Sequence, residues 1–143
     1  MLFRSVLHLL AIANEAGIEL AIDDFDTISA RTPIVADIKP GGRYVATDLF
    51  KAGGVALVAR ELVRAGVVNE DAVGVDGRSL REVADGAHER KGQDVVVSWD
   101  TPLKASGGLA ILRGNLAPEG CVVKLAGHER LYQEGPADRK SVV

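Results

Sequence analysis

The sequence predicts a protein of mixed α and β structure, with helices in the first two-thirds of the chain and strands in the last third. Segments with apolar residues at helical spacing occur before residue 88. Three apolar or β-branched runs, at 94–99, 108–114 and 120–127, follow and are separated by turn-forming residues. The polar stretch "HERKGQ" at 88–93 divides the two parts. This order is typical either of an α+β domain or of a junction between two domains.

The first two helices have candidate boundary residues. Apolar residues recur at helical spacing over 6–16, where Ser5 is a candidate N-cap and Gly17 a candidate stop. We expect a second helix to take Asp23 as its N-cap and to end before Pro33, because the residue preceding a proline disfavours the helical conformation.

Two adjacent glycines interrupt the next helical pattern, which covers 46–66. Thr47 is a candidate N-cap for a first helical piece, and a second piece is expected over 55–65. Glycine inside a helix costs about 1 kcal/mol relative to alanine. Gly53 and Gly54 therefore predict a break between two helices, or a close approach of the backbone to another segment.

The segment 71–87 is predicted to contain a short strand, a turn and a third helical region. Asp76-Gly77 has turn composition. Ser79 is a candidate N-cap, and Leu80 and Val83 would then face inward from the helix that follows.

Composition limits the partners and the compartment. With 143 residues the chain is long enough for one domain or for pieces of two. A net charge of −3, with Lys and Arg scattered along the chain, gives no footprint for nucleic acid or an anionic membrane. No apolar run approaches the roughly 20 residues of a membrane span. The single cysteine excludes an internal disulfide framework and fits a reducing, cytoplasmic location.

Cys121 is the first candidate for chemistry, as a nucleophile, a metal ligand or a core residue. Strand periodicity places it on the same face as Val123 and Leu125, which favours core packing. A metal site would need partners that the chain does not supply, because there is no second cysteine. The three histidines, at positions 8, 88 and 128, share no ligand spacing and are expected to be structural or solvated.

The acidic cluster Asp23, Asp24 and Asp26 has two interpretations. Three carboxylates close together are a possible magnesium site, but acids in a first helical turn also complement the helix dipole. We favour the capping role.

The loop "IKPGGRY" is the second candidate for chemistry. Its glycines, with Lys39 and Arg43 on either side, would surround an anion with backbone N–H groups and cations. It matches neither the P-loop nor the dinucleotide-binding pattern. Turn formation alone also explains Pro40-Gly41-Gly42.

Three long stretches carry a family resemblance. They are "VLHLLAIANEAGIELAIDDFDTIS", "VADIKPGGRYVATDLFKAGGV" and "QDVVVSWDTPLKASGGLAILRGNLAPEGCVVKLAGHE". In this order, from Val6 to about Ala137, the chain resembles the dihydroxy-acid dehydratase family, which also contains phosphogluconate and other sugar-acid dehydratases. The version "VVKLAGHE" is more similar to the branched-chain dihydroxy-acid enzymes.

The resemblance implies an activity and its cofactors. Family members are hydro-lyases that convert a small 2,3-dihydroxy acid to a 2-keto acid, here in branched-chain amino-acid biosynthesis. They use an iron–sulfur cluster, 2Fe–2S or 4Fe–4S, and in many members Mg²⁺. The whole protein is expected to be a homodimer or homotetramer. Two alternatives stay open: a sugar-acid dehydratase of the 6-phosphogluconate or pentonate type, and, from another class, a non-catalytic anion-binding module.

The family motifs also limit what this chain does alone. Cluster cysteines lie in motifs such as C-D-K-x-x-P-G and the catalytic serine in T-D-G-R-x-S-G, and neither motif occurs here. We therefore assign no catalytic or metal-binding residue, and expect this internal fragment to be inactive and to bind neither the cluster nor Mg²⁺. The one site carried over is a substrate-proximal loop: Lys39, Pro40, Gly41 and Gly42.

The resemblance further implies an α/β plus β fold. Residues 6–92 would be the end of an αβα N-terminal domain, and 93–137 the first strands of a C-terminal β-barrel-like domain. Residues 1–5 and 138–143 break the resemblance, and "LFRS" and "DRKS" can be encoded by words that share the reverse-complementary sequence of a common sequencing adapter. We expect both ends to be adapter-derived; other codons in the underlying DNA would refute this.

Overall fold

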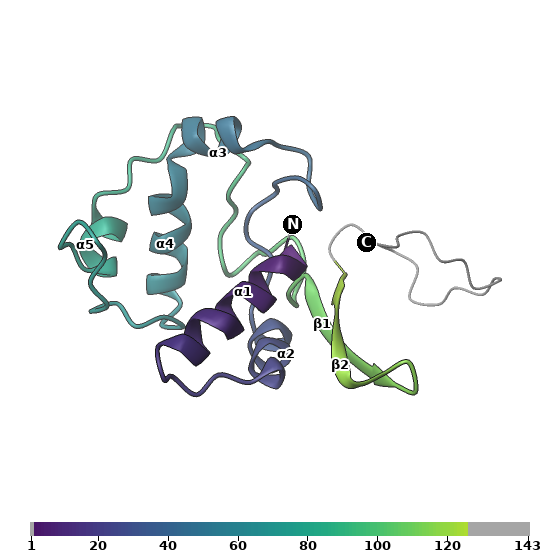
Figure 1. Ribbon diagram of the computed structural model, residues 1–143. Helices are drawn as coiled ribbons and strands as arrows, with labels where there is room; N and C mark the ends of the chain where they lie inside the picture. The colour runs from purple at the N-terminus through teal and green to yellow at the C-terminus, as the bar shows by residue number, and fades with distance from the viewer. Residues whose placement is uncertain (1, 126–143) are drawn as a thin grey trace.

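A computed structural model describes residues 2–125, in which helices precede a two-stranded antiparallel sheet (Figure 1). The expected order of helices before strands is confirmed for this part of the chain. The elements are α1 (Leu2–Glu15), α2 (Ile22–Arg31), α3 (Ala46–Ala52), α4 (Gly54–Arg64), α5 (Leu80–Asp85), β1 (Leu109–Gly114) and β2 (Ala117–Lys124).

The first two helices start at residues other than those predicted. Helix α1 begins at Leu2, so Ser5 lies inside it and is not its N-cap. Its predicted stop is confirmed, since Gly17 adopts φ of +66°. Helix α2 begins after Ala21 rather than Asp23, because the Asp24 carboxylate accepts a hydrogen bond from the Ala21 N–H at 2.8 Å.

The helix break at Gly53 is confirmed. Gly53 has φ of +144° and separates α3 from α4, which meet at a sharp angle (Figure 1). A β-carbon at this position would lie 2.9 Å from the carbonyl oxygen of His88, so the glycine also permits a close backbone approach. Thr47 is not the N-cap of α3. Val45 occupies that position, and its N–H donates to the Asp48 carboxylate at 3.0 Å.

Helix α5 begins with the predicted cap. The Ser79 Oγ accepts from the Glu82 N–H at 3.2 Å, and the Glu82 carboxylate accepts from the Ser79 N–H at 2.7 Å, which is a reciprocal capping box. The strand expected before it is reduced to a single bridge between Val73 and Ser79. The turn at Asp76-Gly77 is confirmed, with φ of +78° at Gly77.

The predicted strand at 94–99 forms only a short pairing with the segment 34–38. A single antiparallel bridge joins Ala36 to Val96, with hydrogen bonds from Asp37 N–H to the Val95 carbonyl and from Val97 N–H to the Val35 carbonyl, each 2.8 Å. The pairing is too short to be a regular strand. It nevertheless forms much of the core, because Val35, Val95 and Val96 are buried there.

The C-terminal hairpin corrects the prediction for Cys121. Strand β2 begins at Ala117, three residues earlier than expected, and residues 126–127 of the predicted strand lie outside the described part of the chain. Cys121 lies opposite Leu112 on the same face, and both are exposed, Leu112 by 52%. The alternation of the strand was therefore insufficient to predict burial, because Val123 on the same face is half-buried while Cys121 is exposed.

Candidate functional site

The loop at residues 38–44 is closed by backbone hydrogen bonds. Ile38 and Tyr44 form a bridge, the Lys39 N–H donates to the Tyr44 carbonyl at 2.7 Å, and the Gly42 N–H donates to the Ile38 carbonyl at 2.9 Å. The Lys39-Pro40 peptide is cis. The four residues of the predicted substrate-proximal loop lie together at this tip, with Lys39, Pro40 and Gly41 exposed.

The buried carboxylate of Asp37 holds the base of the loop. Asp37 is 10% exposed at its side chain, and it accepts hydrogen bonds from the backbone N–H of Arg43 at 2.9 Å and from its Nε at 2.5 Å. The side-chain hydrogen bond from Arg43 lowers the pKa of Asp37, and burial opposes it. The same interaction raises the pKa of Arg43. The loop is therefore tied to a residue just before it in the chain.

A second acidic residue anchors the loop to the segment beyond residue 88. The Tyr44 hydroxyl donates to the Asp94 carboxylate at 2.7 Å, and this hydrogen bond raises the pKa of Tyr44. The Arg43 guanidinium lies 3.6 Å from the same carboxylate and 5.0 Å from the centre of the Tyr44 ring. Arg43 thus lies between two carboxylates, Asp37 and Asp94, which does not favour the predicted role of Arg43 in binding an anion at the loop.

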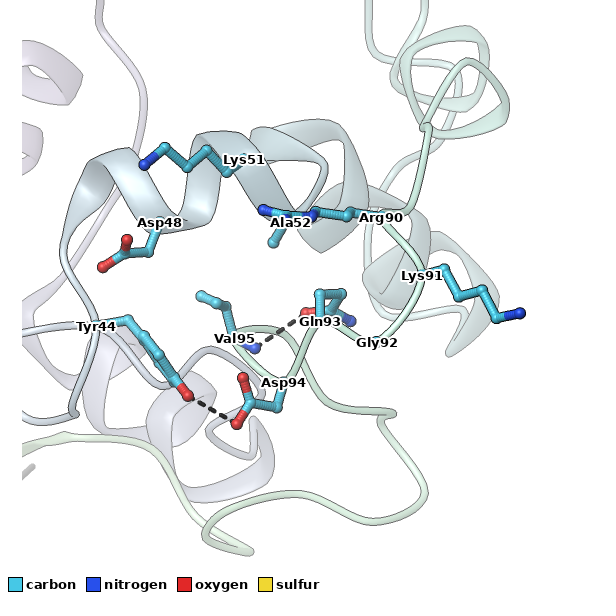
Figure 2. Close-up of a pocket in the computed structure, with 10 residues that line it drawn as sticks. All are labelled: Tyr44, Asp48, Lys51, Ala52, Arg90, Lys91, Gly92, Gln93, Asp94 and Val95. Carbon is cyan, nitrogen blue, oxygen red and sulfur yellow. Dashed lines mark hydrogen bonds between the residues drawn. The ribbon is translucent and has the colours of Figure 1, made fainter.

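A cavity of about 300 Å³ opens beside this anchor (Figure 2). Tyr44 and Asp94 form one side, α3 contributes another, and the turn at 90–93 closes the third. Its lining residues are Tyr44, Asp48, Lys51, Ala52, Arg90, Lys91, Gly92, Gln93, Asp94 and Val95.

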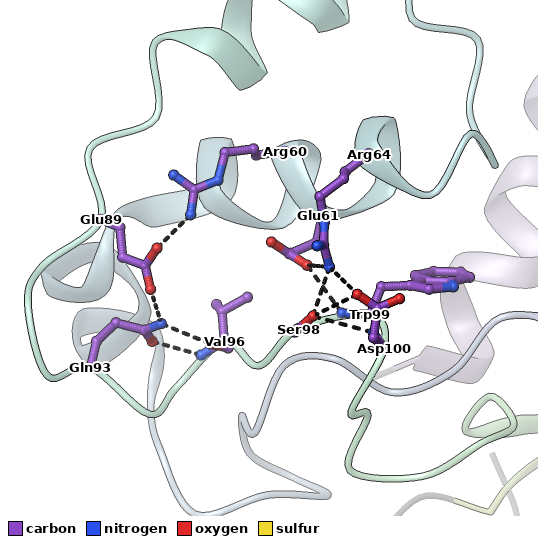
Figure 3. A network of polar contacts seen from close by, with 9 residues as sticks. All are labelled: Arg60, Glu61, Arg64, Glu89, Gln93, Val96, Ser98, Trp99 and Asp100. Atoms are coloured by element: carbon purple, nitrogen blue, oxygen red, sulfur yellow. Dashed lines mark hydrogen bonds and ion pairs between the residues drawn. The ribbon is translucent and has the colours of Figure 1, made fainter.

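A polar network holds the segment 89–100 against α4 (Figure 3). Glu61 is buried, and its carboxylate accepts from the Trp99 backbone N–H and from Arg64, each at 3.0 Å. Arg64 continues to Ser98 Oγ at 2.7 Å and to the Asp100 carboxylate at 3.0 Å. Helix α4 thereby positions the segment 89–100, of which residues 90–95 line the cavity.

The opposite end of that segment is fixed by Glu89 and Gln93. Arg60 donates to the Glu89 carboxylate at 2.5 Å, and Gln93 Nε2 donates to it at 2.8 Å. These hydrogen bonds, that from Gln93 first, lower the pKa of Glu89. The Gln93 amide oxygen accepts from the N–H groups of Val95 and Val96 at 3.0 and 2.9 Å. The turn is therefore held by hydrogen bonds of the Gln93 side chain as well as by its own backbone.

The acidic cluster Asp23, Asp24 and Asp26 is used in hydrogen bonds and an ion pair. Asp24 caps α2, Asp26 accepts from the Ile111 N–H at 2.9 Å, and Asp23 pairs with Arg113 at 2.6 Å. The favoured capping role is therefore correct for Asp24, while the other two join α2 to β1. Among residues 2–125 there is no group of three His, Cys, Asp or Glu side chains placed to hold a metal ion.

The residues of this chain do not fit an iron–sulfur cluster. Such clusters are held by several cysteine thiolates, and the whole sequence contains one cysteine, which lies exposed in β2. His8 and His88 are exposed on separate segments, and His128 lies outside the described residues.

No helix within residues 2–125 is long and apolar enough to cross a membrane.

Sequence reasoning missed Asp37, Tyr44, Asp94 and Glu61. A signal existed for Asp37, which is the one charged residue in the apolar run "IVADI". A carboxylate in such a run is buried only when it is hydrogen-bonded. Tyr44 and Asp94 are partners from segments far apart in the sequence, and Glu61 bonds to the distant Trp99 N–H as well as to Arg64 in its own helix, so no local pattern marks these contacts between segments.

Comparison with known proteins identifies the family. Residues 4–83 match the N-terminal model, and residues 94–139 the C-terminal model, of the dihydroxy-acid/6-phosphogluconate dehydratases. These two matches place the chain in the class of the dehydratases, as its sequence resemblance to that family predicted. The chain belongs to the dihydroxy-acid/6-phosphogluconate dehydratase family.

Its similar relatives share one name. The chain is 56% identical to the dihydroxy-acid dehydratase of Koribacter versatilis, 55% to that of Roseiflexus castenholzii and 52% to that of a Thermus thermophilus strain. Each match covers 94% of this chain but only 23%, 24% and 24% of the respective relative. The chain thus spans about a quarter of the length of the curated relatives it matches.

Proposed function

We propose that this chain is part of a dihydroxy-acid dehydratase, a hydro-lyase that converts a 2,3-dihydroxy acid to a 2-keto acid. The observation that carries the proposal is the 56% identity, over 94% of the chain, to a protein of that name. The substrate, the branched-chain biosynthetic role, the cytoplasmic location and a homodimeric or homotetrameric assembly belong to the same proposal.

The proposed reaction requires removal of a proton from C2 and loss of hydroxide from C3. The resulting enol becomes the 2-keto acid, and the proton and hydroxide leave as water. A base and a group that assists hydroxide loss are both needed. Because this chain does not supply the thiolates for a cluster, we assign neither step to its residues and expect the 143-residue chain alone to be inactive.

The contribution we propose for this chain is to present a fixed loop near the substrate. The support is that Lys39, Pro40 and Gly41 are exposed at the tip while Asp37 and Asp94 anchor its base. We further propose that residues 6–92 end an N-terminal domain and 93–137 begin a C-terminal one. The two matched ranges, 4–83 and 94–139, support that division.

A second candidate is a 6-phosphogluconate dehydratase, which the description of the matching family also names. The names of the similar relatives favour the dihydroxy-acid substrate. The non-catalytic module built on the "KPGGR" loop has less support, because Arg43 already pairs with Asp37 and Asp94.

A segment exchange tests the proposal. Residues 6–137 would replace the matching part of the Koribacter versatilis dihydroxy-acid dehydratase, and turnover of 2,3-dihydroxyisovalerate and of 6-phosphogluconate would be compared with the unchanged enzyme. We expect the exchanged enzyme to keep activity on the dihydroxy acid. A folded exchanged enzyme that acts only on 6-phosphogluconate would contradict the proposal. Turnover by the purified 143-residue chain alone would refute its expected inactivity.

A further inference from the structure

The two matched ranges, 4–83 and 94–139, share one core within the described residues, although each corresponds to a different family model. We propose that the start of the second range, residues 94–111, is built into the first range, so that the stretch 88–93 is not a hinge and both ranges move and unfold as one unit. The division proposed above marks where the two models meet, and the inference is that no independent motion occurs there. It does not depend on the dehydratase activity.

Backbone hydrogen bonds pair the two ranges directly. The segment 34–37 exchanges N–H and carbonyl bonds with residues 95–97 at 2.8 Å and with residues 103–104 at 2.9 Å. Figure 1 shows the chain between α5 and β1 returning past α3 and α4 before it enters the hairpin. A hinge at 88–93 would have to break these bonds whenever it opened, and unpaired buried backbone groups are costly.

The same pairing carries buried apolar side chains from both ranges. Val35 of the first range is 6% exposed, and Val95 and Val96 of the second are each 5% exposed. Separation of the ranges would bring these side chains into water, which the hydrophobic effect opposes. The core at this point therefore requires residues from both sides of the stretch 88–93.

Contacts with two helices fix the segment on its flanks. On α4, the Glu61 carboxylate accepts from the Trp99 N–H at 3.0 Å. On α2, the Ser29 Oγ donates to the Leu109 carbonyl at 2.6 Å. A β-carbon at Gly107 would lie only 2.4 Å from the Ser29 Oγ, so this part of the chain lies directly against α2. Attachment to two helices restricts the orientation of the segment as well as its position.

The stretch 88–93 itself is held by contacts on both sides. The Arg90 N–H donates to the Ala52 carbonyl at 2.9 Å, at the end of α3, and the Glu89 carboxylate pairs with Arg60 of α4. Gln93 bonds back to Glu89 at 2.8 Å. Linkers between domains that move independently are exposed and have few contacts. This stretch is polar in composition, but its contacts are those of a fixed turn.

The coupling has a consequence for the loop tip at Lys39 to Gly42. The Lys124 Nζ, at the end of β2, donates to the Pro40 carbonyl at 3.4 Å. Because the hairpin cannot move away from α2 without breaking the contacts above, it stays beside the loop. In the proposed enzyme the substrate-proximal loop would then be held by both ranges, and this consequence alone rests on the proposed function.

Native-state hydrogen exchange of the full 143-residue chain tests the inference. Amide exchange is followed by NMR at increasing, sub-denaturing urea concentrations. We expect the slowest amides of α4 and those of Asp37, Val97 and Gly107 to converge on one free energy of opening with one dependence on urea. Opening of residues 94–125 at lower free energy, while α4 stays protected, would overturn the inference.

A substitution in the second range should be felt in the first. Val96→Ala removes buried apolar surface, so we expect the slowest amides of α4 and that of Val97 to exchange faster by the same factor, at least about tenfold. Leu116→Ala is the matched control, since Leu116 lies in the same range and is 97% exposed. It should leave exchange within about twofold of the parent. Acceleration by Val96→Ala confined to residues 94–125 would contradict the coupling.

The reciprocal variant is milder and keeps the test decisive if Val96→Ala does not fold. Ser29→Ala removes one hydrogen bond of the first range, and coupling between two parts of a molecule acts in both directions. Exchange at Val97 and in α4 should accelerate equally, by about threefold or more. Ser5→Ala, on an exposed part of α1, is the control and should change neither. Acceleration by Ser29→Ala limited to α2 and β1 would overturn the inference.

Discussion

Gly42 lies so close to Asp37 that a β-carbon at position 42 would be 2.3 Å from the Asp37 Oδ1 and 2.4 Å from its carbonyl carbon. The loop and the buried carboxylate therefore depend on each other. A larger residue at position 42 displaces the carboxylate, and loss of the carboxylate removes the hydrogen bonds that hold Arg43.

We expect Gly42→Ala to lower the free energy of unfolding by about 1–3 kcal/mol, because overpacking against backbone atoms forces the loop to move. Urea denaturation followed by circular dichroism measures this. Gly114→Ala is the matched control, since a β-carbon at Gly114 meets nothing within 4 Å. That variant should be as stable as the parent. Equal stability of the Gly42→Ala chain would contradict the close approach.

Acid should weaken the contribution of Asp37 to stability. Its pKa is lower in the folded chain than the value of about 3.9 for an unfolded aspartate, so its stabilisation is complete above that value and is lost as the pH falls through the folded-state pKa. The Asp37→Asn variant should be less stable than the parent at neutral pH, and the difference in the free energy of unfolding should shrink as the pH is lowered below about 4.

Denaturant unfolding of the Asp37→Asn chain between neutral pH and about pH 3 measures this. The matched control is Asp85→Asn, which changes an exposed carboxyl on α5. A stability difference for Asp37→Asn that stays constant with pH, or that merely equals the control, would show that ionisation of Asp37 does not stabilise the fold.

Glu61→Ala should destabilise the fold and expose the region around Trp99. The substitution leaves the part-buried Trp99 N–H without its acceptor; a fully buried unsatisfied donor costs about 1–3 kcal/mol, so we expect a loss toward the lower end of that range. Trp99 is the only tryptophan, so a red shift of its fluorescence reports the local change directly.

Glu70→Ala is the control for that experiment. Glu70 pairs with Arg81 on a more exposed surface, and such pairs contribute up to about 1 kcal/mol. This variant should leave the Trp99 emission unchanged. If both variants behave alike, the network around Glu61 is not what holds the segment 98–100 against α4.

Cys121 should react with a thiol reagent in the native chain. It is exposed in β2, so modification is expected to be complete without denaturant and nearly as fast as in the unfolded chain. The extent and rate of modification are measured by the absorbance of the chromophore that the thiol reagent releases. Strong protection of Cys121 that disappears in urea would instead favour the core position that strand periodicity predicted.

The sequence by itself determined the local features and the family. Gly17, Gly53 and the pair Ser79 and Glu82 mark helix boundaries, because their conformational freedom or hydrogen bonds involve only a few neighbouring residues. The family could also be recognised, because long stretches that match it in the same order along the chain identify it even where no catalytic motif is present.

Only the tertiary structure decided where side chains lie relative to distant segments. Periodicity gives the face of a strand but not what covers it, and so it misplaced Cys121. Likewise, Asp23 and Asp26 met their hairpin partners only through the path of the whole chain. Burial and charge pairing are sums over neighbours in space, whereas a short stretch of sequence records neighbours along the chain.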